Sequence, residues 1–115
     1  MKRGDIVRVD LPRPVGAPGR EQFGLRPAIV VQDEPGLSVL STVLVIPMTS
    51  NLLAEKFIGS FRVSPSSTNG LTVESIAMTQ QVRAIDRSRI QSVIGYLSPD
   101  ELKHVDRELR RLLKL

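Results

Sequence analysis

The stretch Glu21-Gln22-Phe23-Gly24-Leu25-Arg26-Pro27-Ala28-Ile29-Val30-Val31 leads a single arginine directly into a run of apolar residues. Proline restricts the residue before it to an extended conformation, so Arg26 should project from a defined backbone. Because proline is tolerated mainly at the first position of a strand, the sequence predicts a strand over 27–32 that begins at Pro27. Residues 28–31 show no polar alternation, which indicates a strand buried on both faces.

A second apolar run, Val43-Leu44-Val45-Ile46-Pro47-Met48, ends at two hydroxyl residues, Thr49 and Ser50. It predicts a strand over 40–48. If the two strands are consecutive antiparallel neighbours, the start of the first lies beside the end of the second. Arg26 would then lie next to Thr49 and Ser50 at one rim of a sheet. A fixed cation beside hydroxyl groups suits the binding of a phosphodiester.

Shorter apolar runs and turn signals divide the rest of the chain. The segment 11–20, rich in proline and glycine, predicts a long mobile loop that flanks the Arg26 rim. Residues 51–56 are typical of a single helical turn or a loop, and residues 72–85 of one bent strand or two short ones. Further strands are predicted over 5–10, 57–63 and 90–97.

The last element has the clearest helix signals. Ser98 is in place as a cap, Pro99 as the first helical residue and Glu101 as the third residue of a capping box. Apolar residues then follow at helical spacing, at positions 102, 105, 109 and 112. We expect His104 to lie on a solvated face of this helix. Many short strands and one terminal helix predict a mainly β fold, a small barrel with a C-terminal α-helix packed outside.

The composition limits the possible functions. A chain of 115 residues forms a single domain over 1–115. It has no cysteine, which excludes disulfides, thiolate catalysis and cysteine-ligated zinc. Its one histidine excludes a histidine-rich metal site unless a dimer assembles it. No segment reaches the roughly 20 apolar residues that span a bilayer, so we expect a cytoplasmic protein. The net charge of +4 weakly favours a polyanion as partner.

Four segments, in order, resemble the MazF/PemK toxin family. They are Arg3-Gly4-Asp5-Ile6-Val7, Glu21-Gln22-x-Gly24-x-Arg26-Pro27, Pro47-Met48-Thr49-Ser50 and Gln81-Val82-Arg83-Ala84-Ile85-Asp86. The resemblance implies a toxin of a type II toxin–antitoxin pair with an SH3-like barrel of the CcdB/PemK type. It also implies an mRNA interferase, a metal-independent endoribonuclease that needs no cofactor. Its partners would be single-stranded RNA, a MazE-like antitoxin with a disordered tail, and a second copy in a homodimer.

The resemblance also implies roles for individual residues. The 2′-hydroxyl of the RNA would attack the phosphate, with Arg26 stabilising the phosphoryl charge and donating a proton towards the leaving group. Thr49 would donate a hydrogen bond to a phosphoryl oxygen. Without the resemblance, structural roles are as well supported as catalytic ones: Arg26 could be a surface ion-pair residue and Thr49 a turn residue. Further candidates for binding the substrate are Arg20, Glu21, Gln22, Phe23, Ser50 and Gln80; Glu21 is also suited to orienting Arg26 or accepting a proton.

Two departures from the family pattern bear on the general base. Some relatives have a histidine where this chain has Arg20, and some have Arg-x-Asp where it has Met78-Thr79-Gln80. Neither methionine nor glutamine acts as an acid or base.

We interpret Arg83 and Asp86 as structural residues that pair with each other or with Asp5.

Two other functions are compatible with such a chain. One is a non-catalytic, CcdB-like toxin that binds and poisons a protein such as DNA gyrase, because a fold alone does not decide function. The other is a nucleic-acid-binding barrel without activity.

Overall fold

The computed structural model describes residues 1–16, 19 and 22–115. These residues form seven strands, two α-helices and three 3₁₀ turns. The strands are β1 (Asp5–Leu11), β2 (Gly24–Val30), β3 (Thr42–Thr49), β4 (Ser60–Val63), β5 (Ser75–Met78), β6 (Arg83–Asp86) and β7 (Ile90–Tyr96). The helices are α1 (Gly36–Val39) and α2 (Pro99–Leu113), and the 3₁₀ turns are η1 (Leu52–Lys56), η2 (Thr79–Gln81) and η3 (Arg87–Arg89).

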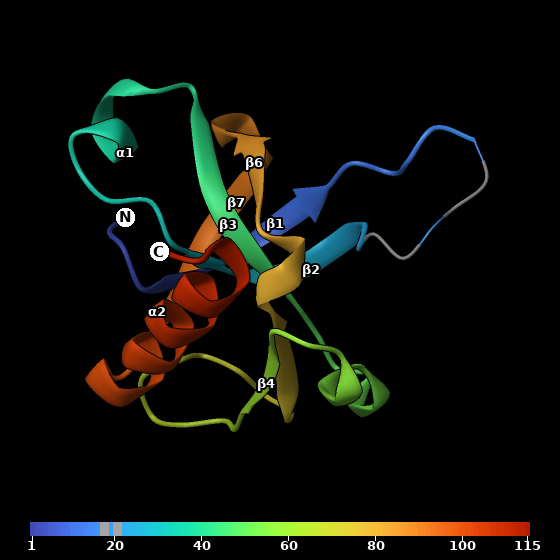
Figure 1. Cartoon of the computed structure of the whole chain (residues 1–115). Coiled ribbons are helices and arrows are strands. Elements are labelled where there is room, and N and C mark those ends of the chain that lie inside the picture. The colour runs from blue at the N-terminus through green and yellow to red at the C-terminus, as the bar shows by residue number, and fades with distance from the viewer. Residues whose placement is uncertain (17–18, 20–21) are drawn as a thin grey trace.

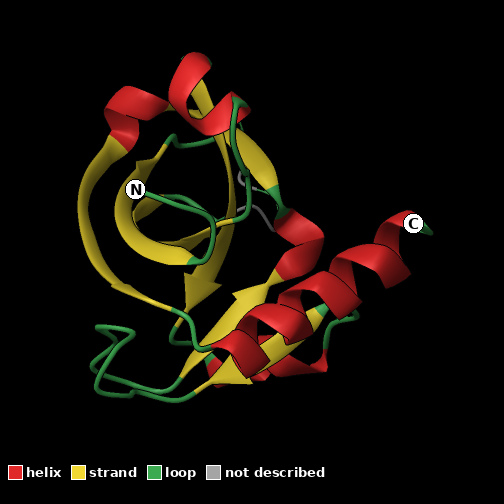
Figure 2. Cartoon of the chain, turned by 90° about the vertical axis from the view of Figure 1, so that its left-hand side faces the viewer, coloured by secondary structure: helices red, strands yellow, loops and turns green. Residues whose placement is uncertain are grey.

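All strand pairs are antiparallel, in the order β4-β5-β3-β2-β1-β7. β3 is shared between two partners on one side, because its first half pairs with β6 and its last two residues pair with β5. The sheet therefore curls round β3, and α2 crosses outside the curled strands (Figures 1 and 2). The prediction of a mainly β barrel with a C-terminal helix is confirmed.

The core consists of two large apolar clusters and a third, small one formed by Ala54, Ile76 and Met78. Alternation along β1 places Val7 and Val9 in one large cluster and Ile6 in the other, as a strand period of two requires. The cluster that contains Ile6 is closed by α2 through Val105, which is fully buried. Burying such a side chain contributes roughly 1.5–3 kcal/mol, so α2 is fixed to the barrel.

The predicted start of the second strand was wrong by three residues. β2 begins at Gly24, and Pro27 lies inside it, paired with Arg8 of β1. Proline has no N–H group and cannot donate a hydrogen bond to a neighbouring strand. Pro27 is tolerated within β2 because the pairing of β2 with β3 begins only at Ala28. β2 also ends at Val30 rather than residue 32, and the short helix α1 follows, which the sequence did not predict.

The strand predicted over 57–63 is shorter than expected. β4 covers only Ser60–Val63, and Phe57 lies outside it as the residue that ends η1. The helical alternative for 51–56 is confirmed as η1, with Asn51 capping its first turn. Residues 72–85 form two short strands, β5 and β6, because η2 interrupts them.

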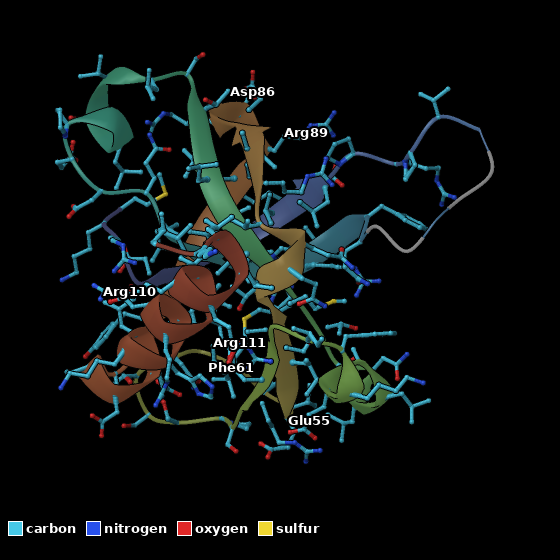
Figure 3. The ribbon with its side chains drawn as sticks, viewed as in Figure 1. Glu55, Phe61, Asp86, Arg89, Arg110 and Arg111 are labelled. Atoms are coloured by element: carbon cyan, nitrogen blue, oxygen red, sulfur yellow. The ribbon has the colours of Figure 1, made fainter. Side chains whose placement is uncertain are left out.

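The terminal helix is confirmed with its capping box. Glu101 N donates to Ser98 Oγ at 3.2 Å, and Ser98 N donates to Glu101 Oε1 at 2.8 Å. The position predicted for His104 was wrong, because its ring stacks on Phe61 of β4, with 4.0 Å between the ring centroids. Figure 3 shows Phe61 beneath α2. The helical turn brings position 104 to the edge of the apolar stripe, next to Val105.

The ion pair predicted for Arg83 and Asp86 was also wrong. Asp86 caps η3 instead, because its Oδ1 accepts hydrogen bonds from Ser88 N and Ser88 Oγ. It lies at the far end of β6, as Figure 3 shows. The carboxylate of Asp5 accepts from Lys2 N at 2.9 Å.

Candidate nucleic-acid site

A cavity of about 980 Å³ opens where β2 and β3 separate. Their ladder ends at the pair Ala28–Pro47, after which β3 continues beside β5 while β2 stays with β1. The start of β2 and the turn η1 lie on the same side of the molecule (Figure 1). Its lining residues include Phe23, Arg26, Thr49, Asn51, Lys56, Phe57, Gln80 and Gln81. The structure thus brings Arg26 and Thr49, which are distant in sequence, to one cavity.

Arg26 is held by the backbone just before it. Its Nε donates a hydrogen bond of 2.9 Å to the carbonyl oxygen of Phe23. Among the residues that the structure describes, none accepts a hydrogen bond from the terminal nitrogens of Arg26 or forms an ion pair with it. The guanidinium is therefore oriented through one nitrogen and keeps its charge for a ligand.

Thr49 ends β3 with a buried side chain. Its Oγ1 accepts a hydrogen bond of 3.1 Å from Asn51 N. A hydroxyl group that accepts one bond can still donate its own proton. Thr49 can therefore offer an oriented O–H to an anion in the cavity. Ser50 is exposed and lies on a second, smaller cavity, which Arg26 also borders.

Two glutamines of η2 and Met78, the last residue of β5, line one wall. The carboxamide of Gln80 is bound to the hydroxyl of Ser60, with Nε2 donating at 3.0 Å. Gln81 Oε1 accepts a hydrogen bond of 3.0 Å from Gln22 N. This bond ties η2 to the segment that carries Phe23 and Arg26. The sequence prediction missed Gln81 as part of the site, although it lies directly beside Gln80.

The cavity is positively charged and partly aromatic. Arg26 and Lys56 contribute cations, and no carboxylate lines the cavity within 1–16, 19 and 22–115. The rings of Phe23 and Phe57 are both on its wall, and Arg13 lies over the ring of Phe23 at 4.4 Å. The charge attracts an anion, and the rings suit stacking with a base. Phe57 was not predicted here, because the sequence placed it inside a strand.

Of the predicted site residues, Arg26, Thr49, Gln22, Phe23 and Gln80 line this cavity. Arg20 and Glu21 lie outside the described residues, as does part of the loop predicted over 11–20. The described residue Gly19 of that loop also lines the cavity. No group of three or more histidine, cysteine, aspartate or glutamate side chains is arranged to hold a metal within the described part of the chain.

Comparison with known proteins gives the family. The family model described as "PemK-like, MazF-like toxin of type II toxin-antitoxin system" matches residues 2–113. The chain belongs to this toxin family. A relative, the endoribonuclease MazF of Staphylococcus saprophyticus, is 31% identical over 106 residues, which cover 92% of this chain and 85% of that protein.

Solved structures of PemK/MazF-like toxins share the fold. MazF from Deinococcus radiodurans matches with a TM-score of 0.79 at 25% identity, over 100% of this chain and 97% of that one. A MazE–MazF complex from the same organism matches with a TM-score of 0.72 at 25% identity, over 100% of this chain and 96% of that one. No described helix is long and apolar enough to cross a membrane.

Against the family pattern, the Met78-Thr79-Gln80 segment lacks the Arg-x-Asp of some PemK/MazF-like relatives. Met78 is 3% exposed, packs with Ala54 and Ile76, and is itself part of the cavity lining. Gln80 is engaged by Ser60. In this chain the segment therefore contributes an apolar lining residue and a hydrogen-bonded amide, neither of which is an acid or a base.

Proposed function

We propose that this chain is the toxin of a type II toxin–antitoxin pair and cleaves single-stranded RNA as a metal-independent, sequence-selective endoribonuclease. One observation carries the proposal. Arg26 and Thr49 line the same positively charged cavity in a chain that belongs to the PemK/MazF-like family. The endoribonuclease activity of the staphylococcal relative supports RNA cleavage over the CcdB-like alternative.

The proposed reaction uses the RNA's own 2′-hydroxyl as the nucleophile. Its oxygen attacks the adjacent phosphorus and releases its proton to water, while the bond from phosphorus to the 5′-oxygen breaks and that oxygen takes up a proton from water. The products are a 2′,3′-cyclic phosphate and a 5′-hydroxyl end. Arg26 stabilises the charge on the phosphoryl oxygens and donates towards the leaving 5′-oxygen, and Thr49 donates to a phosphoryl oxygen. Fixed donors of this kind lower the barrier because they need no reorganisation as charge develops.

The lining of the cavity also supports single-stranded RNA as the substrate. Unstacked bases expose their edges in single strands, so a site that reads a few bases favours such RNA. Phe23 and Phe57 offer rings for stacking, and Gln22 and Gln80 offer amides for hydrogen bonding. Ser50, Arg20 and Glu21 remain proposed substrate-binding residues.

We further propose that the chain works in the cytoplasm as a single toxin domain and as a homodimer. Its proposed inhibitor is a MazE-like antitoxin, in line with the MazE–MazF complexes of Deinococcus radiodurans. A disordered acidic tail would suit the cationic cavity, because such tails fold on the surface that they bind.

The test is cleavage of RNA in excess EDTA by the wild type, Arg26→Ala and Thr49→Ala. Each substitution is expected to lower the rate about 100-fold or more, since each removes a donor to the transition state. Arg107→Ala is the matched control, because Arg107 is exposed on α2 and borders neither cavity. Sequencing the cut ends checks the cyclic phosphate. Cleavage by both site variants at the wild-type rate would refute the assigned site, and intact RNA alongside trapped gyrase would favour the CcdB-like function.

A further inference from the structure

A second cavity, of about 210 Å³, adjoins the first where β2 begins and β3 ends. Side chains alternate between the faces of a strand. At the end of β3, Met48 and Ser50 accordingly line the smaller cavity, whereas Thr49 lines the larger one. Arg26 borders both cavities. Arg26 therefore lies between the two adjoining cavities.

The smaller cavity carries its own cation. Arg8 of β1 lies opposite Pro27 in the β1–β2 register and lines this cavity with an exposed side chain. Among the described residues, no carboxylate lines the cavity or pairs with Arg8. Glu74 is the nearest acid in sequence to the opposite wall, and it accepts a hydrogen bond from Ser64 instead. Exposed hydroxyl groups of Ser50 and Thr72 complete the polar lining.

The shape and charge of this cavity indicate a small anion. Pockets for whole organic ligands usually occupy about 300–1,000 Å³, so this one is small even for a single compact ligand. Two guanidinium groups with neighbouring hydroxyls match the oxygens of a phosphate. In an RNA strand the phosphates follow one another along the backbone. A strand whose reacting phosphate lies at Arg26 must continue past that rim, and the smaller cavity lies directly beyond it.

We propose that the smaller cavity binds the phosphate that neighbours the cleaved one, with Arg8 as its cation. This inference rests on the proposed ribonuclease function and adds a second phosphate subsite to it. Arg8 holds the strand in both the ground state and the transition state, because it touches no reacting atom. Its contribution is therefore uniform binding, which lowers KM and leaves kcat unchanged.

The first experiment compares Arg8→Ala, Arg8→Lys and the control Arg107→Ala on an RNA that the wild type cuts. Arg8→Ala is expected to raise KM about tenfold with kcat unchanged, and Arg8→Lys, which keeps the charge, to retain most of the affinity. The salt dependence of binding to a 2′-deoxy, uncleavable version should become shallower by about 0.7 in log–log slope. Equal KM values for Arg8→Ala and Arg107→Ala would overturn the subsite and leave the ribonuclease function intact. Failure of the wild type to cleave any RNA would overturn both.

The second experiment places one neutral methylphosphonate at each backbone position in turn. For the wild type, one position next to the cut should weaken binding, and in Arg8→Ala the same change should have no further effect. If no neighbouring position matters to the wild type, the subsite does not exist. The oligomeric state of the Arg8→Ala variant in solution is measured as well. Conversion of a dimer to monomers would mean that this face joins two copies of the chain, which would also overturn the proposal.

Discussion

Arg26 is oriented by Phe23, whose carbonyl oxygen accepts a hydrogen bond of 2.9 Å from the Nε of the arginine. Gly24, between them, has φ of +85°, a conformation that favours glycine. The turn at Gly24 lets the backbone reach back to the side chain that follows it. The guanidinium thus has one nitrogen bound to the protein, and no residue within 1–16, 19 and 22–115 accepts a hydrogen bond from its terminal nitrogens.

We expect that lysine at position 26 does not fulfil the role of Arg26. Arg26→Lys keeps the positive charge but loses the fork that binds Phe23 and a phosphate at the same time. We expect RNA cleavage to fall about 100-fold while binding of an uncleavable RNA changes little. Single-turnover rates and equilibrium binding, measured on the same RNA, separate the two effects. Wild-type cleavage by Arg26→Lys would show that only the charge matters.

Gln81 is expected to position the catalytic segment through Gln22. Gln81→Met keeps the size of the side chain but removes the oxygen that accepts the Gln22 N–H, so kcat should fall about tenfold. Gln81→Glu retains an acceptor oxygen for the Gln22 N–H, so the Gln22 amide should stay protected, whereas the added carboxylate should weaken RNA binding. Hydrogen exchange at the Gln22 amide should quicken in Gln81→Met alone. Gln91→Met, on the exposed side of β7, is the control. Unchanged exchange at Gln22 would contradict this role.

Gly95 has no room for a methyl group. A Cβ at this position would lie 2.4 Å from the carbonyl oxygen of Thr68 and 2.4 Å from the carbonyl carbon of Asn69. Because both neighbours are backbone atoms, Gly95→Ala should destabilise the protein by about 1–3 kcal/mol or more. Urea unfolding measures the loss, with Ser92→Ala on the exposed part of β7 as the control. Equal stability of the two variants would mean that the connection between β4 and β5, which carries Thr68 and Asn69, can move away at little cost.

His104 should make stability depend on pH. Burial against the barrel and the nearby charge of Arg107 lower the pKa of His104 below its ordinary value of 6.5, although Glu108 opposes them. The unfolded chain therefore binds the proton more readily, and the free energy of unfolding should fall as the pH drops through 6.5 towards the lower folded pKa. His104→Phe keeps a ring on Phe61 and removes the titration. Urea unfolding at about pH 7.5 and about pH 5.5 should show a smaller difference for this variant than for wild type.

Local signals in the sequence predicted much of the fold. The capping box at Ser98 and the alternation along β1 operate within a few residues, so their physics is readable without long-range contacts. The identity of Arg26 and Thr49 as site candidates came from their places at the ends of two apolar runs and from the resemblance to a family. The predictions were wrong where contacts with residues distant in sequence set the limits of an element. Pro27, for example, lies inside β2 because the strand pairs with β1 at Arg8.

By itself, the sequence determined which residues alternate, where the terminal helix begins and which family the motifs resemble, because these depend on local spacing and residue type. Tertiary structure alone decided that β3 leaves β2 after Pro47 and pairs with β5, which opens the cavity between Arg26 and Thr49. It also decided that Gln81 meets Gln22 and that His104 stacks on Phe61. Such contacts join residues far apart along the chain, and their energies exist only once the barrel has closed.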